Sequence, residues 1–121
     1  MVRLGIIEES LTNRKVLEKL SKYFISQRIE NVQDDEYSIW HVNEYHISDE
    51  QVYLLFDLLK ENIKETWYIH AFNAKSLYVI LKGKWFEISL YKNETWAEMI
   101  EYGIKYAQVE RFYLESIQLT I

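Results

Sequence analysis

Apolar and polar residues alternate along three short segments in the middle of the chain. The segments are 67–72, 77–82 and 85–91. Successive side chains of a β-strand point to opposite faces of its sheet, so this period of two predicts three strands. In the first segment, the alternation places Tyr68, His70 and Phe72 together on one face. Contact with water alone does not favour so many aromatic groups on an exposed face, so the pattern indicates a surface that binds something.

The second and third segments are typical of a β-hairpin. A two-residue loop at Gly83-Lys84 places Leu81 opposite Phe86, and glycine in the first loop position suits a type II′ turn. The predicted core face of this hairpin consists of Leu77, Val79, Leu81, Phe86, Ile88 and Leu90. The predicted reverse face consists of Tyr78, Ile80, Trp85 and Glu87.

The flanking sequence predicts further strands and three helices. The strands are predicted at 4–7, 25–32 and 38–47, with a short terminal strand at 117–121. A first helix follows a cap at Asn13 or Thr12, and capping boxes at 48–51 and 95–98 predict the starts of two more. A further helical turn is predicted within 109–116. The sequence has no Pro, three Gly and no linker-like stretch, so we expect a single domain over residues 1–121.

This order of elements predicts an α+β fold. The first six elements follow a ferredoxin-like β-α-β-β-α-β layout, an antiparallel sheet with helices on one face. The extra hairpin then widens the sheet beside the 67–72 strand. We expect a bulge or an odd-length loop at Asn73–Ser76, which would put Ile69 and Ala71 on the core face with Val79 and Leu81.

With that loop, the side chains on the non-core face form one aromatic patch. The patch consists of Tyr68, His70, Phe72, Tyr78, Ile80 and Trp85, with Glu87 at its side. Three interpretations are open: residues 109–121 or another helix cover it as a second core, two copies of the chain pair through it as a homodimer, or it holds a small-molecule ligand. The first two are close competitors, and the ligand pocket comes third.

Composition narrows the class of protein. The net charge is −5 and no cluster of Lys or Arg stands out, which disfavours a nucleic-acid partner. The absence of Cys excludes disulfides, thiol catalysis and thiolate metal sites. No apolar run approaches the roughly 20 residues of a membrane span, and two carboxylates follow the first residues too early for a signal peptide. We therefore expect a soluble, cytoplasmic protein without a membrane partner.

Catalytic signals are weak. The three histidines, His41, His46 and His70, have no metal-binding spacing, and no glycine-rich phosphate loop is present, so we expect no metal and no cofactor. On an unbulged strand His41 and His46 point to opposite faces, while His41 and His70 approach each other if both strands contribute to the open face. The leading hypothesis is a non-catalytic binding or interaction module. The rival is a small enzyme that uses His41 or His70 as acid or base, with Glu8 or Glu9 assisting.

Several short motifs resemble a small uncharacterised bacterial protein family over nearly the whole chain. The motifs are Glu9-Ser10-Leu11, Trp40-His41, Trp67-Tyr68-x-His70, Lys82-x-Lys84-x-Phe86 and Ile100-Glu101-Tyr102-Gly103. The chain departs from this pattern at Ala71-Phe72 and at 107–109. The family has no assigned activity, so the resemblance implies a protein of unknown function and assigns no catalytic residue. The candidate binding residues remain Tyr68, His70, Phe72, Tyr78, Trp85 and His41.

Overall fold

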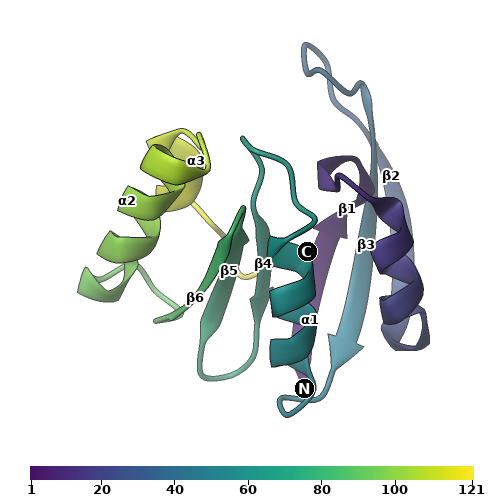
Figure 1. The fold of residues 1–121 in the computed structure, drawn as a ribbon, viewed down its shortest axis with the longest axis horizontal. Coiled ribbons are helices and arrows are strands. Elements are labelled where there is room, and N and C mark those ends of the chain that lie inside the picture. Colours follow the sequence, from purple (N-terminus) through teal and green to yellow (C-terminus); the bar gives the residue numbers. More distant parts are fainter.

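A six-stranded antiparallel sheet runs through the computed structural model, which describes residues 1–121 (Figure 1). The strands are β1 (Val2–Ile7), β2 (Phe24–Asn31), β3 (Ile39–Ile47), β4 (Ile69–Phe72), β5 (Leu77–Leu81) and β6 (Lys84–Ile88). Their order across the sheet is β2-β3-β1-β4-β5-β6. The predicted α+β class is confirmed, and the β5–β6 hairpin does widen the sheet beside β4.

The helical elements are short. They are the 3-10 helices η1 (Glu8–Ser10), η2 (Arg14–Tyr23) and η3 (Glu94–Trp96), and the α-helices α1 (Val52–Lys60), α2 (Ala97–Tyr106) and α3 (Arg111–Glu115). None of them combines the length and the hydropathy that a membrane span requires. The helical turn predicted within 109–116 is confirmed as α3, whereas residues 117–121 form no strand.

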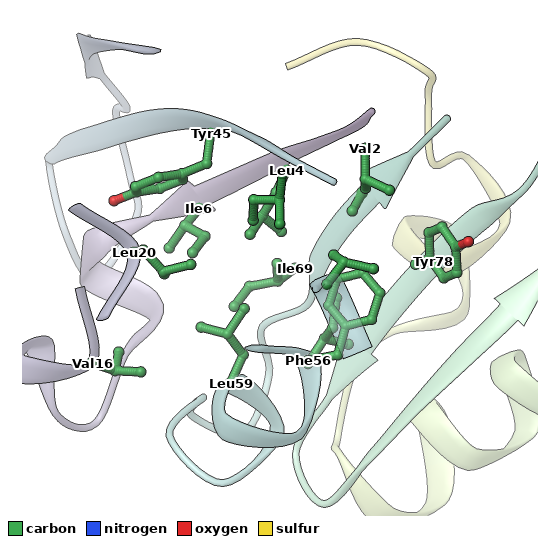
Figure 2. Close-up of a cluster of buried hydrophobic side chains, with 14 of the residues drawn as sticks. Val2, Leu4, Ile6, Val16, Leu20, Tyr45, Phe56, Leu59, Ile69 and Tyr78 are labelled. Carbon is green, nitrogen blue, oxygen red and sulfur yellow. The ribbon is translucent and has the colours of Figure 1, made fainter. Parts of the chain in front are cut away.

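The first core lies between one face of the sheet and the helices η2 and α1. Alternate residues of β1, Val2, Leu4 and Ile6, are fully buried on this face. Figure 2 shows them beside Phe56 of α1 and Leu20 of η2. This arrangement follows from the alternating pattern of β1, because every second side chain meets the helices.

A second core covers the other face of β4, β5 and β6. Here Val79 and Leu81 pack with Met99 of α2 and Leu114 of α3, and Figure 1 places α2 and α3 apart from α1. The prediction that all helices lie on one face is therefore wrong. The reason is that every residue of β5 is buried, and a strand that is apolar on both faces needs cover on both.

The turn of the β5–β6 hairpin is displaced by one residue from the prediction. Leu81 pairs with Lys84, so the two-residue loop is Lys82-Gly83. Gly83 takes a φ of 90°, a left-handed conformation that glycine adopts without steric cost. The pairing between the strands consequently shifts by two residues, which leaves the face assignments intact. The predicted core residues of β5 and β6 are buried as expected, and Leu90, beyond β6, is partly buried.

The loop between β4 and β5 overturns the predicted patch. Phe72 pairs directly with Leu77 across a four-residue loop, without a bulge. Ile69 and Ala71 therefore share a face with Tyr78 and not with Val79. The side chain of Asn73 closes the loop by accepting hydrogen bonds from the main-chain N–H groups of residues 75 and 76.

Two of the three predicted helix starts differ from the prediction. Asn13 caps η2 as predicted, by accepting a 3.0 Å hydrogen bond from the Lys15 N–H. Helix α1 starts after Gln51 without a side-chain cap. Before η3, Asn93 is the cap, since it accepts a hydrogen bond from the Thr95 N–H. Both predicted capping boxes are therefore wrong.

Candidate functional site

The second core leaves part of the sheet uncovered, and we call this part the open face. It is the side of β2, β3 and β1 that carries Arg3, Gly5 and Ile7 and lies opposite to η2 and α1. The segment Ile117–Ile121 crosses it. An added Cβ at Gly5 would lie 2.8 Å from a methyl carbon of Ile121, so glycine is needed here for the segment to lie against the sheet.

Two hydrogen bonds fasten this segment. The Nε2 atom of His70 donates to the carbonyl oxygen of Thr120 at 2.7 Å. The Nη1 atom of Arg28 donates to the main-chain oxygen of Ile121, also at 2.7 Å. Because these bonds come from β4 and β2, they hold the segment at both margins of the open face.

Beside this segment lies a cavity of about 590 Å³, which we call the open-face pocket. Its aromatic walls are Trp40, Trp67, Tyr68 and Tyr113, together with the ring of His70. Its charged lining residues are Arg28, Glu30, Asp35 and Glu36. The remaining lining residues are Gly5, Ile7, Val42, Thr66, Val109, Thr120 and Ile121. Strands, α3 and the terminal segment thus all contribute to the walls.

The structure brings two of the six candidate residues to this pocket, Tyr68 and His70. Phe72 shares their face but belongs to the second core, where its ring stacks on that of His70 at 6.0 Å. Tyr78 and Trp85 lie on the opposite face, against Tyr53 and Phe56 of α1. The single patch predicted from the sequence is therefore divided between the two faces of the sheet.

Sequence reasoning missed three aromatic walls of the pocket. Trp40 comes from β3, Trp67 from the segment before β4, and Tyr113 from α3. The rings of Trp40 and Trp67 lie 5.2 Å apart at an angle of 61°. Alternation along 67–72 would place Trp67 on the face opposite to Tyr68 and His70. Because β4 begins only at Ile69, strand alternation does not determine the direction of the Trp67 side chain.

His70 is held neutral by its surroundings. Burial of the ring lowers its pKa; the Thr120 carbonyl opposes this shift, and the positive charge of Arg3 adds to it. Since a carbonyl oxygen can only accept, the Nε2 atom carries the proton of the neutral ring. In this state His70 fastens the terminal segment and adds no charge to the pocket.

Replacing His70 with Gln is expected to flatten the pH dependence of the free energy of unfolding. The pKa of His70 lies below its ordinary value of 6.5, so the unfolded chain binds this proton more readily. The stability from neutral His70 is present above pH 6.5 and is lost as the pH falls through the folded-state pKa. Urea denaturation at about pH 7.5 and about pH 5.5 should show a larger loss for the wild type. Equal losses in both proteins would contradict this assignment.

A second polar cluster surrounds Glu9 on the opposite side of the sheet. The buried carboxylate of Glu9 accepts hydrogen bonds from the His41 main-chain N–H at 2.8 Å and from the His41 Nδ1 atom at 2.7 Å. Arg14 donates to the same carboxylate at 3.1 Å. Burial alone would raise the pKa of Glu9, but the hydrogen bonds from His41 outweigh it, and the pKa is lowered.

This cluster separates the three histidines. His41 faces Glu9 on the side of η2 and α1, whereas His70 points to the other side of the sheet, so the predicted approach of these two rings is wrong. His46 lies opposite to His41 across β3, as the alternation predicted, and contacts Glu44 at 2.6 Å. Nowhere in the structure do three His, Asp or Glu side chains gather in a way that could hold a metal ion.

Comparisons with known proteins found no match: no family model, no curated protein and no solved structure is similar to this chain. The function of this protein has therefore to be inferred from the geometry and chemistry of the site itself.

Proposed function

We propose that this protein is a non-catalytic binding module that holds a small molecule in the open-face pocket. The observation that supports this proposal best is the cavity of about 590 Å³ with four Trp and Tyr walls. Ligand sites in proteins are typically concave, mostly apolar and about 300–1,000 Å³ in volume, with a few polar groups that orient the ligand. The open-face pocket fits this description in size and in lining.

The walls of the pocket are fixed before any ligand arrives. Trp40 donates a 3.2 Å hydrogen bond from its indole to Asp35, and Trp67 packs against Trp40. On the other side, His70 and Arg28 fasten the terminal segment. A preformed site avoids much of the entropy that binding would otherwise cost, and this supports a binding role for the pocket.

We also propose that a ferredoxin-like unit is formed by β1, η2, β2, β3, α1 and β4, and that the β5–β6 hairpin is appended to it. The order β2-β3-β1-β4 supports this, together with the antiparallel pairing of β1 with both β3 and β4. In such a unit, the face opposite to η2 and α1 is available for binding, which is where the pocket lies.

Replacing Trp67 with Ala is expected to weaken the binding of small aromatic and amphipathic fragments roughly tenfold, because it removes one of the two tryptophan walls of the pocket. Ligand-observed NMR with a fragment library would measure the affinities. Tyr91→Ala is the matched control, since this exposed aromatic residue lies outside the pocket. If no fragment discriminates between wild type and Trp67→Ala, the pocket is not the binding site.

The alternative function is a small enzyme with an acid–base pair. The contact of 2.7 Å between His41 and Glu9 favours it, because Glu9 holds the Nδ1 proton and leaves Nε2 of a half-exposed ring free to accept one. The test is turnover of chromogenic esters, phosphates or glycosides. Activity that is lost in His41→Gln but kept in His46→Gln would support this function. His41 does not line the open-face pocket, so the two proposals concern separate sites.

Homodimerisation remains a prediction. The terminal segment already occupies part of the open face, which makes a symmetric contact through that face harder to form. One of the two edge strands of the sheet is β2, where Ile25 and Ile29 are exposed. An exposed edge strand is a common place for chains to pair.

A further inference from the structure

We propose that the ligand of the open-face pocket is an organic cation that carries an ammonium group on an apolar body. This inference rests on the proposed binding function and specifies the class of ligand. The aromatic walls of the pocket, its distribution of charge and its apolar floor all favour such a ligand.

The aromatic walls are arranged to attract a cation. Trp40 and Trp67 meet at 61°, so that they form a corner rather than a flat stack. The faces of aromatic rings carry partial negative charge, and Trp attracts ammonium groups most strongly. An ammonium group already lies beside the neighbouring ring of Tyr37, which is 6.4 Å from that of Trp67: the Nζ atom of Lys64 lies 4.6 Å from the Tyr37 ring centre and donates a 2.6 Å hydrogen bond to its hydroxyl.

The charged residues of the pocket leave an excess of negative charge. Arg28 is the cation of the lining, and its Nε atom donates to Glu30 at 2.7 Å while its Nη1 atom donates to Ile121. Its charge is therefore already paired. Asp35 and Glu36 line the same pocket and form no ion pair. A carboxylate or phosphate ligand would be repelled, whereas a cation would be attracted.

Asp35 is oriented toward the aromatic corner. Its Oδ2 atom accepts hydrogen bonds from the Tyr37 N–H at 3.0 Å and from the Trp40 indole at 3.2 Å. These bonds fix the carboxylate at the edge of Trp40 and leave its Oδ1 atom without a protein partner. A ligand ammonium seated between Trp40 and Trp67 would have this negative charge beside it.

The floor of the pocket suits the rest of the ligand. Val42 and Val109 are buried side chains that line it, and Ile7 lies next to them on the open face. An inorganic cation gains nothing from such a surface and requires several oxygen ligands instead. An ammonium group on an apolar body can use the aromatic corner and the apolar floor at the same time.

The test compares choline with its uncharged isostere, the alcohol in which tert-butyl replaces trimethylammonium. Titration followed by the NMR signals of the tryptophan indole N–H groups gives both affinities. We expect choline to bind roughly tenfold more tightly than the isostere, and Trp67→Ala to remove this preference.

Asp35→Asn should weaken the binding of choline severalfold and leave the binding of the isostere unchanged. Asp34→Asn is the matched control, because Asp34 precedes Asp35 but does not line the pocket, and Asn tolerates its φ of 63°.

The outcomes separate this inference from the proposed function. Equal affinities for choline and the isostere, or tighter binding of the isostere, would overturn the ligand class while leaving a binding pocket in place. The ligand class would also be overturned if Asp34→Asn weakened choline binding as much as Asp35→Asn does. If neither compound binds and the fragments also fail to discriminate Trp67→Ala, the proposed function itself fails.

Discussion

Val79→Asp is expected to prevent the chain from folding. Val79 has no exposed surface and lies in the middle of β5, against α2 and α3. An aspartate at this position would bury a charge without a partner, which costs several kcal/mol. A domain of this size has roughly 5–15 kcal/mol of stability in total, and the same substitution also removes apolar packing. Near-ultraviolet circular dichroism and urea denaturation at neutral pH would measure the result.

Tyr91→Asp is the matched control for this variant. It introduces the same charge just beyond the β5–β6 hairpin, at a side chain that is largely exposed. We expect it to fold with a stability within about 0.5 kcal/mol of the wild type. A folded Val79→Asp protein with an unchanged thermal midpoint would mean that the second core is not built around β5.

Phe56→Ala is expected to lower the free energy of unfolding by about 3–5 kcal/mol. Phe56 is fully buried in the first core, where its ring lies 5.0 Å from that of Tyr78 and 5.3 Å from that of Trp85. Its truncation leaves a cavity between α1 and the sheet that these rings cannot fill without moving. Chemical denaturation of the purified variant would measure the change.

Leu54→Ala tests whether this loss is specific to the buried face of α1. Leu54 belongs to the same helix, two residues before Phe56, and is mostly exposed. We expect a change of less than about 0.5 kcal/mol. A loss at Leu54 as large as that at Phe56 would indicate that α1 packs with another face toward the sheet.

The fold was predicted best where one local pattern determines the outcome. The alternation of β5 and β6 gave the correct faces even though the turn was placed one residue late, because the resulting pairing shifts by two and preserves each face. Helix starts were predicted less well, because Asn93 and Thr95 are both suitable capping residues and sequence does not say which one caps. In the structure Asn93 accepts from the Thr95 N–H, whereas the Thr95 hydroxyl accepts from the Ser89 N–H outside the helix. The second layer of helices was missed because burial of β5 on both faces is a property of the whole fold.

The candidate site depends on contacts that are distant in the sequence. His70 could be predicted, because the alternation of β4 points it to the same side of the sheet as Gly5, and Tyr68, just before this strand, lines the same pocket. The pairing of Trp40 with Trp67, and the approach of Tyr113, require the complete arrangement of the strands and α3. From the sequence, His41 or His70 could act with Glu8 or Glu9, and sequence alone does not choose among these pairs. The structure brings Glu9 and His41 together because η1 directly follows β1 and lies beside β3.

The most direct test of the binding proposal uses the four tryptophans as internal reporters. Trp40 and Trp67 line the open-face pocket, whereas Trp85 lies on the opposite face and Trp96 in the second core. During titration with fragments or choline, the indole N–H signals of Trp40 and Trp67 should shift together along one saturable curve, and those of Trp85 and Trp96 should stay in place. Saturable shifts confined to Trp85 or Trp96, or none at Trp40 and Trp67, would contradict the assignment of the open-face pocket as the binding site.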